Sequence, residues 1–260
     1  MDVYFESDRD VQSVPSEVVR TVDPTQKFVS ALSLLGNGPL TGAELVGVRL
    51  AMACASVLPV DGAGISVFTS DGIRIPVGAS DHDASTAERL QFTVAEGPCL
   101  TVHQTGQPVV ASESVLARQW PLFHQALVAH TPFRAVTSVP LQSELAEIAT
   151  MDLYFQHSAD ALSIDMATVD DINEHISLTL IDEVPSIGSH PRWMDSPTAT
   201  RRSCVFLAIG MISVDMELST QDALAVLRAR AYATDRSIDD TAREIVDQHV
   251  PLERLHLDSD

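Results

Sequence analysis

The sequence predicts an α+β domain, with an antiparallel sheet flanked by helices, followed by an all-α unit of three helices. Three observations carry this prediction. Short β-rich runs alternate with helical patterns between residues 63 and 156. A stretch rich in proline and serine, 185–197, then interrupts the chain, and every apolar pattern beyond it has helical spacing. At 260 residues the chain is long enough for both parts.

The first part of the chain combines helices and strands. In the helix from residue 41, Leu45, Val48 and Met52 follow the spacing of one buried face, and Pro59 ends it. In chain order we expect helices around 28–35 and from 41, a hairpin of strands 63–69 and 73–78, a helix or loop lid at 83–96, a helix opened by Gly97-Pro98, a strand at 107–112, a helix at 120–129, strands at 135–141 and 147–156, and a helix from 165.

The last part has the start signals of three helices. Ser196-Pro197 is a cap followed by a first-turn proline, and Ser219 to Asp222 and Ser237 to Asp240 have the form of capping boxes. The first of these helices carries two apolar stripes, Val205, Ile209, Ile212 and Met216 on one side and Leu207, Met211, Val214 and Leu218 on the other. A helix that is apolar on two sides needs two partners, so we expect a homodimer.

These patterns divide the chain into five segments. We expect a mobile N-terminal segment at 1–23, the α+β domain at 24–184, a linker at 185–197, the three-helix unit at 198–250 and a C-terminal tail at 251–260.

The composition excludes several classes of protein. With 16 basic and 36 acidic residues the formal charge is −20, which argues against a protein that coats nucleic acid broadly. No apolar run approaches the length of a membrane span and the N-terminus has no signal-peptide pattern, so we expect a cytoplasmic protein without a membrane partner. Cys54, Cys99 and Cys204 are isolated and the nine histidines show no metal-ligand spacing. We therefore expect no metal centre and no catalytic site, and no cofactor can be named.

The three C-terminal helices resemble the ANTAR family, the three-helix RNA-binding domains of bacterial transcription antitermination regulators. The residues that carry the resemblance are Ala208-Ile-Gly-Met-Ile-Ser, Asp222-Ala-Leu-Ala-Val-Leu-Arg228 and Arg236-Ser-Ile-Asp-Asp-Thr-Ala-Arg-Glu-Ile-Val246. The resemblance implies that this unit binds stem-loop RNA and controls transcription termination.

The region before them resembles a GAF domain. The marks of this resemblance are 63–69, Glu96-Gly-Pro-Cys-Leu100, Gly106-Gln-Pro-Val109, Trp120-Pro121, Ser138-Val-Pro-Leu141 and Met151-Asp-Leu-Tyr154. The order of the two domains is that of GAF–ANTAR regulators, which implies a sensor that gates the RNA-binding unit in response to an unknown small-molecule ligand. GAF domains bind ligands between the sheet and its covering helices, where Phe68, Phe92, Cys99, His103, Phe123 and Phe133 either line a pocket or fill the core.

Four arginines are the candidate RNA contacts: Arg228, Arg230, Arg236 and Arg243. Guanidinium groups suit phosphates and guanine edges. The alternative is that they form ion pairs with nearby acids on the helix surfaces, because residues 201–260 contain seven arginines against eleven acids, a net charge of −4. A second function therefore stays open, in which the three-helix unit serves protein interaction or dimerisation and does not bind RNA.

Overall fold

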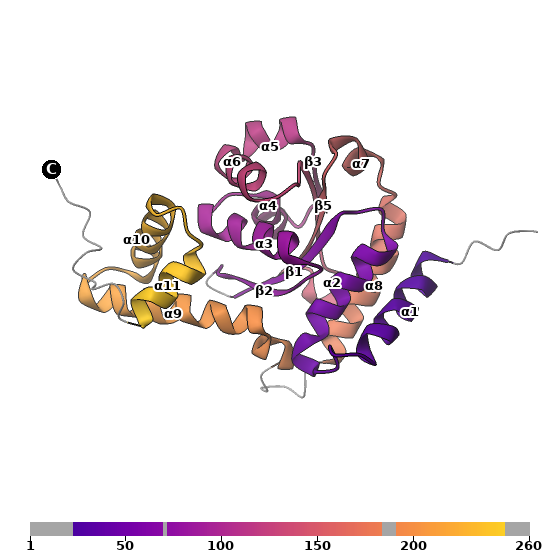
Figure 1. Ribbon diagram of the computed structural model, residues 1–260, viewed down its shortest axis with the longest axis horizontal. Helices are drawn as coiled ribbons and strands as arrows, with labels where there is room; N and C mark the ends of the chain where they lie inside the picture. The colour runs from indigo at the N-terminus through magenta and orange to yellow at the C-terminus, as the bar shows by residue number, and fades with distance from the viewer. Residues whose placement is uncertain (1–22, 70–71, 184–190, 248–260) are drawn as a thin grey trace, which may run out of the picture.

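The computed structural model describes residues 23–69, 72–183 and 191–247 (Figure 1). At its centre lies a five-stranded sheet in the order β2-β1-β5-β4-β3, in which every neighbouring pair is antiparallel. The strands are β1 (Gly62–Phe68), β2 (Arg74–Ala79), β3 (Val109–Ala111), β4 (Ala135–Pro140) and β5 (Ala149–Phe155). The antiparallel sheet that the sequence predicts is confirmed.

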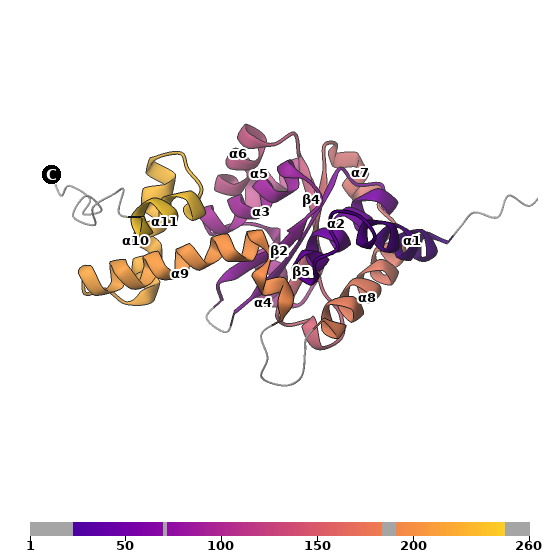
Figure 2. The same cartoon turned by 60° about the horizontal axis from the view of Figure 1, so that its bottom comes forward.

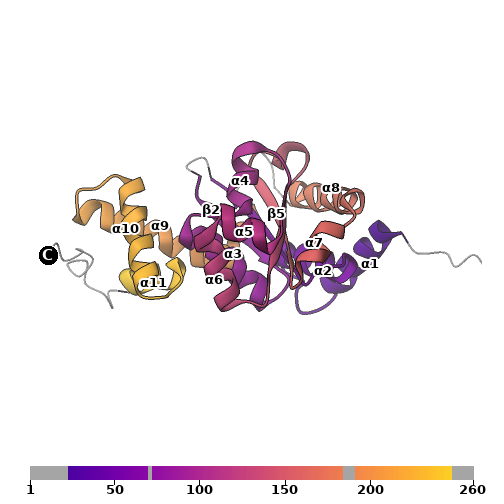
Figure 3. The same ribbon diagram turned by 90° about the horizontal axis from the view of Figure 1, so that it is seen from above.

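Helices cover both faces of the sheet (Figures 1 and 2). One face packs against α1 (Pro24–Gly36), α2 (Val46–Val57) and α8 (Met166–Asp182). The other lies under α3 (His82–Val94), α4 (Pro98–Thr105), α5 (Glu113–Gln119) and α6 (Pro121–His130). The view from above in Figure 3 separates these layers. Short connections complete this part: η1 (Ala43–Leu45), η2 (Ser143–Leu145) and α7 (Ser158–Ser163).

Residues of the central strand β5 alternate between the two layers. Met151, Leu153 and Phe155 pack in the apolar core with α2 and α8. Asp152 and Tyr154 point to the opposite face, and all five are buried. The period of two along a strand thus places an apolar row under one layer of helices and a polar pair under the other.

Several elements differ from the sequence prediction. The segment at 83–96, for which a helix and a loop lid stayed open, forms α3, and α2 begins only at Val46, after the 3-10 turn η1. Neither α5 nor α7 was predicted. Each has at most seven residues, which is too short for a helical period to stand out from the sequence.

The C-terminal unit consists of α9 (Pro197–Asp215), α10 (Thr220–Ala233) and α11 (Ile238–Val246), as expected. The hydroxyls of Ser196, Ser219 and Ser237 accept hydrogen bonds from the backbone amides of the first turns. In both predicted capping boxes the aspartate accepts a hydrogen bond from the serine hydroxyl at 2.6 Å. Aspartate is one methylene shorter than the usual glutamate, which accounts for its bonding the hydroxyl in place of the cap's own backbone amide.

The C-terminal unit packs against the α+β part along α3 and β2. Its core, built from residues such as Val205, Leu227 and Ile245, also contains Phe92 of α3. The short helix η3 (Arg192–Asp195) precedes α9, and its Trp193 lies in the core beside α2 and α8. The described end of the predicted linker is thus packed rather than free.

Other sequence expectations lie outside the described residues. They concern 1–22 of the N-terminal segment, 184–190 of the linker region, the last residues of the three-helix unit and the whole tail at 251–260. In the described chain, no single helix is long and apolar enough to cross a membrane; α9 and α10 pass that test only as a pair bent by 111°.

Candidate functional site

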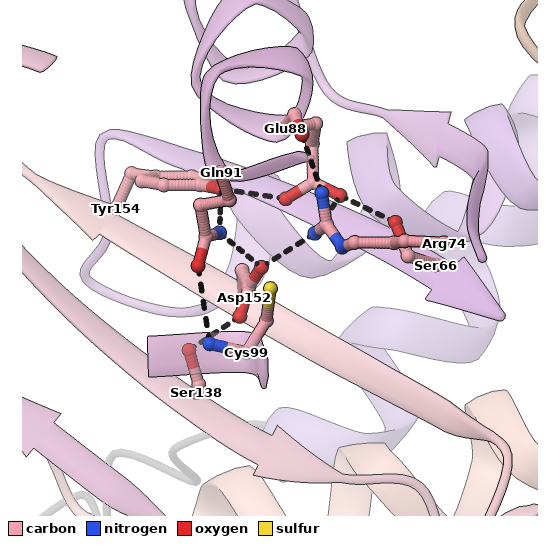
Figure 4. Close-up of polar contacts among 8 residues, drawn as sticks. All are labelled: Ser66, Arg74, Glu88, Gln91, Cys99, Ser138, Asp152 and Tyr154. Carbon is pink, nitrogen blue, oxygen red and sulfur yellow. Dashed lines mark hydrogen bonds and ion pairs between the residues drawn. The ribbon is translucent and has the colours of Figure 1, made fainter. Parts of the chain in front are cut away.

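A buried network of polar side chains lies between the sheet and α3 (Figure 4). It draws on four strands and two helices, and its members are Ser66, Arg74, Glu88, Gln91, Cys99, Ser138, Asp152 and Tyr154. All are buried. A cluster of this kind is costly to bury unless its members satisfy one another.

Arg74 of β2 is the cation at the centre of the network, and none of its side chain is exposed. Its Nη2 lies 2.6 Å from Glu88 Oε2 and 2.8 Å from Asp152 Oδ2, and its Nη1 donates to the Glu88 carbonyl oxygen. Burial works against the charged form of Arg74. The nearby carboxylates of Glu88 and Asp152 outweigh burial, so the pKa of Arg74 is raised and the side chain stays a cation.

The Asp152 carboxylate of β5 accepts three hydrogen bonds in the network. Gln91 Nε2 donates to Oδ2 at 2.8 Å, the Ser138 hydroxyl donates to Oδ1, and Arg74 completes the set. Burial, together with the charge of Glu88, raises the pKa of Asp152 from 3.8 to about 7. The charge of the network therefore changes near neutral pH.

Strand register brings these side chains together. Asp152 pairs with Ser138 of β4 on one side and with Gly64 of β1 on the other. A Cβ at Gly64 would overlap the carboxyl group of Glu88, so glycine at this position makes room for that side chain. Glu88 and Gln91 are three residues apart on α3 and share the face turned to the sheet.

The network also includes Gln91, Cys99 and Tyr154. Gln91 Oε1 accepts from the Cys99 backbone amide at 3.1 Å, and the Tyr154 hydroxyl donates to Glu88 Oε1 at 2.6 Å. Burial raises the pKa of the Cys99 thiol, which keeps it protonated and a poor nucleophile. Burial, followed by the charge of Glu88, likewise raises the pKa of Tyr154.

The network can respond to charge. Its carboxylates, hydroxyls and amide are bonded to one another, while Arg74 Nε has no hydrogen-bond partner among the described residues. A proton on Asp152 would change the charge of the network, which α3 contacts through Glu88 and Gln91. In the described part of the chain no group of three or more histidine, cysteine or acidic side chains could hold a metal ion.

The pocket residues expected from the sequence do not come together. Cys99 belongs to the network. Phe68 stacks on His103 with ring centroids 3.8 Å apart, and Phe123 and Phe133 fill the core under α5 and α6. Of the two roles left open for Phe92, the structure shows core packing: the side chain faces the C-terminal unit, because the next position after Gln91 is turned about 100° around the helix.

The charged members of the network were missed in the sequence. Asp152 stands between two apolar residues of a strand, and Arg74 stands between Ile73 and Ile75. A charge inside an apolar strand is a signal of a buried, paired group. The identity of the partners depends on strand order and on α3, which are not local properties of the sequence.

The four candidate RNA contacts differ in their local partners. Arg228 is half-buried, its Nε donates to the Phe92 carbonyl oxygen at 3.2 Å, and burial lowers its pKa. Arg236 forms an ion pair with Glu244 on α11. An ion pair with a nearby acid, the alternative to RNA contact, is present for Arg236 alone of the four, while Arg228, Arg230 and Arg243 have no carboxylate within 4 Å among the described residues.

Phe92 lies at the centre of the contact between α3 and the C-terminal unit. The guanidinium carbons of Arg202 and Arg228 lie 3.9 Å and 4.8 Å from the centre of its ring. Beside it, the Ile238 backbone amide donates to Thr93 Oγ1 at 3.3 Å. Cation–π contacts strengthen when they are removed from water, so this cluster stabilises the docked arrangement.

Several solved structures are similar to this chain, among them the following three. A GAF domain of a phosphoenolpyruvate-protein phosphotransferase from Coxiella burnetii is 11% identical with a TM-score of 0.42, and the match covers 61% of this chain and 95% of that one. The corresponding GAF domain from Acinetobacter is 10% identical with a TM-score of 0.42, covering 62% and 96%. Free methionine-R-sulfoxide reductase from Neisseria meningitidis, in complex with its substrate, is 14% identical with a TM-score of 0.37, covering 60% and 87%. No protein-family model matches the chain, and no curated protein matches it.

Proposed function

We propose that this protein is a cytoplasmic, signal-sensing regulator in which a GAF-type domain gates an ANTAR-type unit that binds RNA and controls transcription termination. The sensor in this proposal is the α+β part with its buried polar network. The effector is the unit α9–α11, whose helix order and caps agree with the motifs from which RNA binding is inferred.

The observation that carries the proposal is the double role of α3. Glu88 and Gln91 on one side of this helix are bonded into the network. Phe92 and Thr93 on the next side contact the C-terminal unit. A signal that moves the network therefore acts on the helix to which the effector is docked.

The docked arrangement would limit RNA binding because it covers part of a candidate RNA contact. Arg228, a candidate RNA contact, is held against Phe92 and is only partly exposed there, which limits its contact with a phosphate. A ligand or proton would favour RNA binding only if it binds the undocked state better than the docked one. In the undocked state Arg228 would join Arg230 and Arg243 as a free cation.

A second candidate function is a protein-interaction regulator that binds no RNA. The pairing of Arg236 with Glu244 and the burial of Arg228 favour it, because phosphate contacts supply most non-specific RNA affinity. Both candidates share the sensor and the docking, and they differ only in what the released unit binds.

Filter binding of the full chain to an RNA with two tandem hairpins, at several salt concentrations, separates the two. Phe92→Ala removes the docking contact and is expected to raise RNA affinity about tenfold, since it releases Arg228. In the Phe92→Ala background, Arg230→Gln and Arg243→Gln should each weaken binding and reduce its dependence on salt.

Arg118→Gln, an exposed arginine of α5, is the matched control and should leave RNA affinity unchanged. Absence of binding at low salt in both the wild type and Phe92→Ala would reject the RNA-binding function and favour the second candidate. Far-UV circular dichroism of the Phe92→Ala variant tests whether it still folds.

A further inference from the structure

A small cavity of about 10 Å³ lies at the contact between α3, β2 and α9. A space of this size holds about one water molecule or one small ion. Its lining includes Glu88 and Arg89 of α3, Arg201 and Arg202 of α9, and Asp239 of α11. One arginine of α3 and two of α9 therefore line the same small cavity.

Arg202 is the unusual member of this lining. Its side chain is fully buried, and none of its three guanidinium nitrogens has a hydrogen-bond partner among the described residues. Its closest carboxylate oxygen, Asp239 Oδ1, is 3.3 Å from Nε, and Phe92 covers one face of the group. A buried guanidinium without hydrogen bonds is costly, so an acceptor is missing here.

The charges around the cavity favour an anion over a water molecule. Glu88 already forms an ion pair with Arg74, and Asp239 is the one carboxylate within 4 Å of Arg202 in the described chain. Arg89 donates to the hydroxyls of Ser85 and Thr86 and has no carboxylate within 4 Å among the described residues. Burial lowers the pKa of Arg202 to about 10, and the repulsion from Arg74, Arg228 and Arg89 adds to this effect.

We propose that this cavity binds one small inorganic anion, of the size of chloride, between Arg202, Arg201 and Arg89. The small volume favours a monatomic anion over a phosphate group, which has four oxygens around its centre. The first turn of α9 supports the site, because Thr198 also lines the cavity and helix N-termini favour negative charge. An anion here would connect α9 to α3 and stabilise the docked arrangement.

The line width of the chloride-35 NMR signal, measured with the full chain in sodium chloride, tests this directly. We expect saturable broadening that bromide competes away and that sodium gluconate at equal ionic strength does not. Arg201→Gln removes one donor on an exposed side chain and should weaken chloride binding about tenfold. Arg202→Met should abolish the saturable part.

Arg243→Gln makes the same charge change on the exposed side of α11 and should leave the broadening as in the wild type. A wild type without saturable broadening, or an equal loss in Arg201→Gln and Arg243→Gln, would show that the cavity holds water and would overturn the proposal. If Arg202→Met does not fold, Arg201→Gln and Arg89→Gln decide between the outcomes. None of these outcomes depends on whether the protein binds RNA.

Discussion

The titration of Asp152 gives the buried network its pH dependence. Burial and Glu88 raise the pKa of this carboxyl from 3.8 to about 7 in the folded protein. At a pH between 3.8 and about 7, Asp152 holds a proton in the folded state that it has lost in the unfolded state. Folding therefore takes up a proton, and stability must fall as the pH rises through this range.

We predict that the wild type loses on the order of 2 kcal/mol of unfolding free energy between pH 5 and pH 8 because of Asp152. Asp152→Asn resembles the protonated acid and should match the wild type at pH 5 and be more stable than it at pH 8. Urea denaturation at both pH values measures this difference.

Asp170→Asn, an exposed carboxylate on α8, is the control, and its pH dependence should follow that of the wild type. Parallel curves for Asp152→Asn and the wild type would mean that Asp152 is already ionised at pH 5 in the folded state. The network would then be a structural ion pair that does not change its charge near neutral pH.

At the scale of single elements, the sequence predicts best where the signal is local. The caps of α9, α10 and α11 lie where serine and proline place them. Of the two apolar stripes of α9, one is buried at Val205, Ile209 and Ile212, while the other is exposed at Leu207 and Val214 and half-buried at Met211. The helices α5 and α7 could not be predicted because they are too short to show a helical period. The orientation of α3 could not be predicted, because the sides of this helix that contact the polar network and the C-terminal unit meet segments that are distant in the sequence.

The serine cap of α10 provides a test at this scale. Ser219 Oγ accepts a hydrogen bond from the Asp222 amide at 3.1 Å and donates to its carboxylate. We predict that Ser219→Ala lowers the unfolding free energy by about 1 kcal/mol, since the amide loses its partner and the carboxylate its donor. Thermal or urea denaturation measures the change.

Ser203→Ala is the matched control, because Ser203 is an exposed serine within α9 whose hydroxyl makes no hydrogen bond among the described residues. Its replacement should change stability by less than about 0.5 kcal/mol. Equal losses in the two variants would contradict the role assigned to the cap.

At the scale of the whole molecule, α9 presents an apolar face that the described chain does not cover. Leu207 and Val214 are 57% and 82% exposed, and with Phe206 and Met211 they line an open groove around Gly210. Nothing in the described chain lies within 4 Å of a Cβ added at Gly210, so the backbone there is open to close approach. A second copy of α9 is apolar at the same spacing and could bury this face against its own.

We therefore predict that the protein is a homodimer at micromolar concentration and that Val214→Asp makes it a monomer, as measured by light scattering coupled to size-exclusion chromatography. A carboxylate at position 214 would have to be buried without a partner in the dimer, whereas in the monomer it would stay in water. Leu34→Asp on α1, which places the same charge at a side chain that is 75% exposed, should leave the mass that of a dimer. A monomeric mass for the wild type would refute dimerisation through α9, while equal dissociation by Leu34→Asp would move the interface away from this helix. Because α9 also carries Arg202 on its docked side, a dimer through its free side would let both copies undock without separating, so that two sets of arginines could contact one RNA.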